Sequence, residues 1–180
     1  MGERKYSGPL ERPGRWSAYG MLVLLTAVMG SSGAQAAAGK MAWQGTVTHV
    51  TDGDTLWVRP QRGGAPRQIR VDGMDAPEIC QSHGETARSA LTAHVLGQQV
   101  QVRGRRTDDY GRLLARISLQ GQDVGGWMVS QGQAWSYRYR RNAGPYAAQE
   151  AQARAHRRGL FSDARPEHPR DFRKRHGNCH

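Results

Sequence analysis

The sequence predicts an α+β fold in which a small five-stranded β-barrel carries about three packed helices. Short runs of β-branched residues, separated by turn residues, fill the first half of the chain after residue 40. One stretch with helical periodicity interrupts these runs, and two more follow them. No internal repeat is present, which argues against a solenoid. This order is typical of a small closed barrel of the oligonucleotide-binding (OB) type.

The first three strands are expected at residues 43–50, 55–59 and 68–71. The first run is rich in β-branched residues and partly alternates between apolar and polar side chains. Asp52 and Gly53 form a turn signal between the first two strands. A loop rich in proline and glycine then leads to the third strand.

The first helix is expected over residues 85–96, because apolar side chains recur there every four residues. Gly97 follows in the position that commonly ends a helix. Alternating side chains then predict strands at residues 99–103 and 113–119, with a polar loop over residues 104–111 between them.

Two further helices are expected at residues 124–131 and 145–156, each followed by a glycine. Residues 162–180 contain two prolines and many charges, and we expect them to form an extended tail. The chain is therefore expected to hold a single OB-type domain over residues 37–163, followed by a basic C-terminal tail over residues 164–180.

The first 36 residues have the pattern of a secretory signal peptide. Four basic residues precede a largely apolar run at residues 21–29, and small residues follow up to Ala34-Gln35-Ala36. A retained membrane anchor is the alternative, but a spanning helix needs about 20 apolar residues, far more than this run supplies. We expect cleavage after Ala36, export to a periplasm or out of the cell, and no stable membrane association afterwards.

The part of the chain that follows the leader is strongly basic. The full sequence has 26 basic and 15 acidic residues, and residues 37–180 keep 22 and 13 of them, a net charge of +9. Such a charge favours polyanions such as DNA and RNA as partners. A basic protein that is merely soluble is the alternative, since charge alone does not identify a partner.

Cys80 and Cys179 are the two cysteines. An even pair in an exported protein indicates a disulfide. The bridge would close a loop of about 100 residues and stabilise the fold by up to about 4–5 kcal/mol in the chain-entropy model. It would also place the C-terminal tail beside residues 75–80.

Three clusters of acidic and basic residues suggest chemistry. They are Asp52-Gly53-Asp54, then Arg70 with Asp72, Asp75 and Glu78, then Asp108-Asp109-Tyr110-Gly111-Arg112. Each cluster alone reads as a polar or salt-bridged loop. Carboxylates this dense repel one another unless a cation or an arginine compensates, and oxygen ligands alone indicate calcium or magnesium rather than zinc. Together they offer a metal site, a general base and phosphate-binding arginines, as phosphodiester hydrolysis needs.

These clusters carry a resemblance to the thermonuclease (staphylococcal nuclease) family. The matching segments, in family order and spacing, are residues 47–55 (VTHVTDGDT), 69–78 (IRVDGMDAPE), 109–112 (DYGR), 129–134 (VSQGQA) and 158–161 (RGLF). The resemblance covers about residues 42–163. It implies an OB barrel with packed helices and a metal-dependent endonuclease activity.

The resemblance also implies a metal site. The side chains of Asp54 and Asp75 and the backbone carbonyl of Ala76 match the family's calcium ligands, and magnesium is the alternative ion. Ala76 departs from the threonine often found there, but it still supplies a carbonyl. Asp52 resembles a carboxylate that acts on the metal through water.

Three further positions match the family's catalytic residues. Glu78 matches the general base, and Arg70 and Arg112 match two arginines that bind the phosphate. In that scheme water attacks in line, Glu78 takes its proton, and the 5′ oxygen leaves. The family's products carry a 3′-phosphate and a 5′-hydroxyl.

Three tyrosines are candidates for substrate binding. Tyr110 is one residue removed from Arg112, and Tyr137 and Tyr139 alternate with arginines. Aromatic rings interleaved with arginines suit base stacking and backbone contacts. The family has two tyrosines in its nucleotide pocket, but aligning them here needs a one-residue gap. Tyrosines that merely cover the barrel rim are the alternative.

The sequence thus predicts an exported, calcium-dependent nuclease that acts on DNA, RNA or both, as a monomer. A catalytically silent OB-type binding module is one alternative, and a cationic structural protein is another. The acidic and arginine positions that silent copies lose are all present here, which argues for activity.

Overall fold

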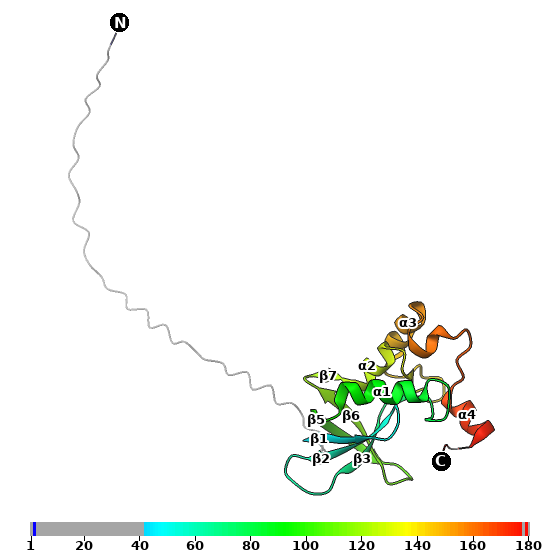
Figure 1. The fold of residues 1–180 in the computed structure, drawn as a ribbon. Coiled ribbons are helices and arrows are strands. Elements are labelled where there is room, and N and C mark those ends of the chain that lie inside the picture. Colours follow the sequence, from blue (N-terminus) through cyan, green and yellow to red (C-terminus); the bar gives the residue numbers. More distant parts are fainter. Residues whose placement is uncertain (1, 3–41, 178, 180) are drawn as a thin grey trace. The chain divides into compact units, whose positions relative to one another are not determined.

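The computed structural model describes residues 2, 42–177 and 179 (Figure 1). The expected signal peptide lies outside the described residues. The elements in chain order are β1 (Ala42–Val50), β2 (Thr55–Pro60), β3 (Arg67–Val71), β4 (Met74–Asp75), α1 (Gly84–Val95), β5 (Gln99–Thr107), β6 (Leu113–Leu119), β7 (Gln122–Asp123), α2 (Val124–Ser130), β8 (Trp135–Ser136), α3 (Ala147–Ala155), the 3-10 helix η1 (Gly159–Ser162) and α4 (Pro169–His176). Over this part of the chain, no helix combines the length and the apolar character needed to cross a membrane.

Five strands close into the predicted barrel. Antiparallel pairs join β3 to β2, β2 to β1, β1 to β5 and β5 to β6. A parallel pair, with Ile69 opposite Leu113 and Val71 opposite Ala115, joins β3 to β6 and completes the circle. The α+β class and the five-stranded OB-type barrel are therefore confirmed.

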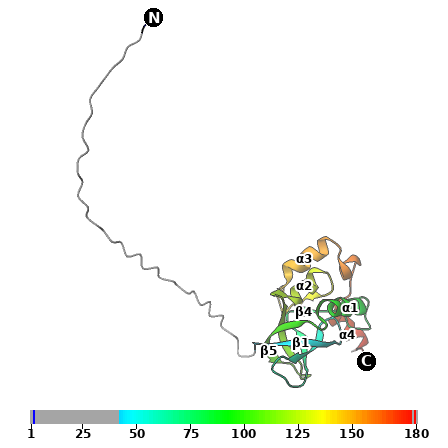
Figure 2. The same cartoon turned by 60° about the vertical axis from the view of Figure 1, so that its left-hand side comes forward.

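Helices α1 and α2 complete a hydrophobic core with the barrel. Leu56 and Ile117 of the barrel are fully buried, together with Leu91 of α1 and Met128 of α2. In two views α2 and α3 lie together beyond one end of the barrel (Figures 1 and 2). The apolar positions that predicted α1 are its buried face, because side chains four residues apart point the same way.

Residues 104–107 continue the strand that the sequence predicted to end at residue 103. β5 reaches Thr107, and its pairing with β6 shifts register between Gly104 and Arg106. The polar, exposed side chains that suggested a loop belong to a strand end that faces solvent.

The prediction of an extended tail over residues 162–180 is wrong. Residues 169–176 form α4, and η1 reaches Ser162. The prolines that suggested an extended chain include Pro169, which stands in the first turn of α4. Proline is favoured there, because its fixed φ fits a helix and its missing N–H has no partner to lose. His168 caps the helix by accepting a hydrogen bond from the Arg170 amide.

The disulfide between Cys80 and Cys179 is confirmed, with a Cα–Cα distance of 5.8 Å. It joins the loop before α1 to the end of the chain across 99 residues of sequence. A second contact lies nearby, since the Gln81 side chain donates a hydrogen bond to the backbone carbonyl oxygen of Glu167 at 2.6 Å. The C-terminal segment is thus fastened to the loop that follows β4.

Removing the bridge should destabilise the fold. Replacing Cys80→Ser and Cys179→Ser together should lower the free energy of unfolding by up to about 4–5 kcal/mol, the chain-entropy value for a loop of this length. Denaturant unfolding of oxidised wild type and the double variant measures this difference. Reductant should destabilise only the wild type; equal stability of the oxidised wild type and the variant would contradict the prediction.

Candidate active site

A cavity of about 1150 Å³ collects almost all residues with a predicted function. Its lining includes Asp52, Asp54, Arg70, Ala76, Glu78, Tyr110, Arg112, Tyr137 and Tyr139. Asp75 does not line the cavity; it is 1% exposed and lies beneath it, in contact with Arg70. Residues from three separate clusters of the sequence therefore converge on one site.

The turn between β1 and β2 brings two carboxylates to this site. Asp52 accepts a hydrogen bond from the Asp54 amide at 2.9 Å, which fixes the turn. Gly53 is needed because a Cβ there would lie 2.7 Å from the Cβ of Ala76 and 2.8 Å from that of Ala87. The close approach places Asp54 beneath the loop after β4, where its Oδ2 accepts a hydrogen bond from the Ala76 amide at 3.3 Å.

Arg70 bridges the two buried carboxylates. Its Nη1 lies 2.7 Å from Oδ1 of Asp54, and its Nη2 lies 2.7 Å from Oδ1 of Asp75. The negative charge of Asp54, above all, raises the pKa of Arg70, so its charge is permanent. Besides the phosphate contact predicted from sequence, Arg70 of β3 thus links the turn between β1 and β2 to β4 at the cavity floor.

Burial and repulsion between neighbouring carboxylates make Asp52 and Asp75 harder to ionise. Burial, with the charge of Asp54 as a second cause, raises the pKa of Asp52 from 3.8 to about 7. The same two causes raise the pKa of Asp75. At both positions these two causes outweigh the opposing effect of the Arg70 charge.

Arg112 is aimed into the cavity by Asp108, whose role the sequence did not reveal. Asp108 accepts hydrogen bonds from the amides of Tyr110 and Arg112 and from Nε of Arg112, each at about 2.9–3.0 Å. Burial alone would raise the pKa of Asp108, but these hydrogen bonds and the charge of Arg112 lower it. Gly111 makes the turn at φ 79°, where other residues are strained.

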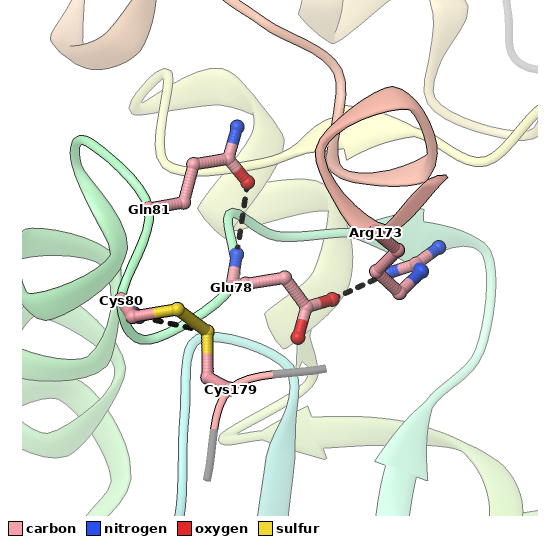
Figure 3. The surroundings of a disulfide bond; sticks show 5 residues. All are labelled: Glu78, Cys80, Gln81, Arg173 and Cys179. Carbon is pink, nitrogen blue, oxygen red and sulfur yellow. Dashed lines mark hydrogen bonds and ion pairs between the residues drawn. A yellow bond between two sulfur atoms is a disulfide. The ribbon is translucent and has the colours of Figure 1, made fainter. Parts of the chain in front are cut away.

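Glu78 lies on the loop after β4, and its carboxylate faces an arginine from the C-terminal helix. Arg173 of α4 donates from Nη1 to Oε1 of Glu78 at 2.5 Å (Figure 3). Its Nη2 lies 3.5 Å from Oδ2 of Asp75. Arg173 also lines the cavity. Sequence reasoning missed it, because the cysteine pair placed the tail beside residues 75–80 but did not indicate which side chain of the tail reaches the site.

Tyr137 and Tyr139 follow β8 on a segment that hydrogen bonds hold to Glu150 of α3. The buried Glu150 accepts hydrogen bonds from the Ser136 amide, Arg138 and Arg154, each at 2.9 Å. Both tyrosines are exposed, at 47% and 63%, and Tyr110 is 76% exposed. Three large aromatic side chains are therefore accessible along the cavity.

The acidic groups suit a hard cation. Asp52, Asp54 and Glu78 line the cavity and Asp75 lies beneath it, so several carboxylates gather in one place, although arginines line the same cavity. Oxygen-only donors of this kind suit calcium or magnesium. Within the described residues, no three acidic, histidine or cysteine side chains already converge as a ligand group; Arg70 stands between Asp54 and Asp75.

An OB-type barrel whose cavity gathers carboxylates, arginines and exposed aromatic rings has the features expected of a hydrolase of nucleic acid phosphodiesters. A family profile described as "Staphylococcal nuclease homologue" matches residues 68–163. The chain therefore belongs to the staphylococcal nuclease family, as its motifs predicted. It is a nuclease, and its substrate is nucleic acid.

Individual relatives agree with this assignment. The chain is 36% identical over 151 residues to "Protein ParB" of Escherichia coli, covering 76% of this chain and 84% of that protein. It is 35% identical over 154 residues to the "Micrococcal nuclease" of Shigella flexneri, covering 77% and 86%. An "Uncharacterized endonuclease" of Escherichia coli is 35% identical over 132 residues, covering 73% and 85%.

The raised pKa of Asp52 predicts a pH dependence of stability without metal. With a pKa near 7 when folded and 3.8 when unfolded, Asp52 binds a proton more readily in the folded state between these values. Its favourable contribution is therefore lost as pH rises through about 7. Between pH 5 and pH 8, chelated Asp52→Asn protein should lose less stability than wild type in denaturant unfolding.

The exposed Asp109 of a neighbouring loop offers the matched control, Asp109→Asn. If Asp52→Asn and wild type lose equal stability over this pH range, the perturbed carboxyl is not Asp52.

Proposed function

We propose that this nuclease is exported, depends on calcium and hydrolyses DNA, RNA or both to leave 3′-phosphate ends. The observation that carries the proposal is the convergence of Asp54, Asp75 and Glu78 with Arg70 and Arg112 at one cavity. The crowding of carboxylates there, which raises the pKa of Asp52 and of Asp75, supports binding of a divalent cation.

Asp54, Asp75 and the backbone carbonyl of Ala76 would hold the calcium ion, and Asp52 would act on it through water. When bound, the ion would polarise the phosphate and lower the pKa of a bound water. The buried positions of Asp54 and Asp75 support this assignment, because burial keeps competing solvent away from their oxygens.

Glu78 takes the proton from the attacking water in this mechanism. Its carboxylate lies at the cavity surface with its side chain 23% exposed, so solvent reaches it. Arg112 and Arg70 bind the equatorial phosphate oxygens and stabilise the charge that grows in the transition state. The 5′ oxygen leaves, so the phosphate stays on the 3′ side.

The three tyrosines bind the nucleotide. Tyr110 lies beside Arg112, whose guanidinium carbon is 5.3 Å from the ring centroid. Tyr137 and Tyr139 present exposed rings from the segment after β8. Stacking of bases on such rings tolerates any sequence and is worth about 1–3 kcal/mol per base.

Export is supported by the leader pattern of residues 1–36 and by the disulfide, a bond that persists in oxidising compartments. The destination is a periplasm or the medium. Action as a monomer is part of the same proposal.

Incubation of residues 37–180 with plasmid DNA and with RNA tests the proposal. Degradation is expected with calcium and should be abolished by a chelator, with magnesium less effective. Glu78→Gln should lower kcat by about 10²–10⁴-fold through loss of the base. Arg112→Ala should lower it by about 10²–10³-fold through loss of charge stabilisation.

Matched controls are Glu85→Gln and Arg62→Ala, at exposed positions away from the cavity. Mass spectrometry of oligonucleotide products identifies the end that keeps the phosphate. Binding of DNA by folded wild type with no turnover in any metal would reject the catalytic proposal and leave a binding module. Turnover in chelator would reject the metal dependence alone.

A further inference from the structure

The C-terminal helix α4 places the guanidinium group of Arg173 beside Glu78, the candidate general base. Arg173 donates to Oε1 of Glu78 at 2.5 Å and approaches Oδ2 of Asp75 at 3.5 Å (Figure 3). Partial burial alone would lower the pKa of Arg173, but the charges of Asp75 and Glu78 raise it. Arg173 therefore stays charged while it faces both carboxylates.

Arg173 is held in place at several points. The disulfide joins Cys179 to Cys80, only two residues after Glu78. At the start of α4, Pro169 is buried, and the ring of His168 lies 5.2 Å from that of Trp135. Both ends of the segment are thus fixed to the core or to the loop that carries Glu78.

Glu78 depends on Arg173 for its orientation. Across the described residues, the Glu78 carboxylate makes no other hydrogen bond or ion pair. The residue lies outside helices and strands, and its side chain is only partly buried. A free glutamate side chain of this kind samples several rotamers, and fixing it costs conformational entropy. A charge-assisted hydrogen bond from a fixed arginine offsets that cost.

We propose that Arg173 is a positioning residue of the nuclease reaction, holding the Glu78 carboxylate aimed into the cavity. α4 and the disulfide are then parts of the active site rather than a solvated tail. This inference rests on the proposed role of Glu78 as general base.

The test compares kcat and KM of Arg173→Ala, Arg173→Lys and wild type on DNA at saturating calcium. Misplacing a catalytic group by about 1 Å costs on the order of 100-fold in rate, so Arg173→Ala should lose about 10- to 100-fold in kcat. KM should stay within about 2-fold, because in this role Arg173 contacts Glu78 rather than substrate. Lysine keeps the charge and should restore part of the loss.

Arg170→Ala is the matched control, since Arg170 lies on the same helix, is exposed and does not line the cavity. It should leave kcat unchanged. Each variant is first shown to be folded by its thermal midpoint. Calcium stabilisation of that midpoint should half-saturate at the same or a lower concentration in Arg173→Ala, because a cation beside Asp75 has been removed.

A double-mutant cycle with Glu78→Gln decides whether Arg173 acts through Glu78. If it does, Arg173→Ala causes no further loss in the Glu78→Gln background. Equal losses in both backgrounds, a higher KM at constant kcat, or weaker calcium binding would each overturn the proposal, as would higher activity of Arg173→Ala, the sign of an inhibitory clamp. An inactive wild type would instead reject the proposed function, and this inference with it.

Discussion

The site depends on one guanidinium group, that of Arg70, held between the carboxylates of Asp54 and Asp75. Both carboxylates are almost fully buried, and a buried charge that loses its partner destabilises a protein by about 3–5 kcal/mol. The barrel supplies the arginine, since Arg70 lies opposite Thr55 of β2 on one side and Leu114 of β6 on the other. The strand pairs that close the barrel therefore also position the arginine of the cavity floor.

The cavity that holds these carboxylates is also lined by arginines, Arg112 and Arg173 among them. Acidic and basic side chains therefore share one cavity. Such a mixture suits a substrate that is itself an anion, because arginines attract the phosphate backbone of nucleic acid.

The features that could be predicted from the sequence are those encoded by a local pattern of residues. The five barrel strands and the helix over residues 85–96 follow from periodicity, and the cavity residues follow from motifs in register. The pairing of β4 with β8, the role of Asp108 and the return of Arg173 to Glu78 were not predictable. Two-residue strands have no period, and contacts between residues about 100 positions apart depend on a tertiary path. The cysteine pair was the one sign of that path.

The disulfide joins Cys179, which follows α4, to Cys80, which follows Glu78. It is therefore a covalent link between the helix that carries Arg173 and the loop that carries Glu78. In a reducing compartment both cysteines stay thiols, and α4 is then held by its noncovalent contacts alone. The attachment of α4 to the site thus responds to the redox state of the surroundings, whereas the barrel, which contains neither cysteine, does not.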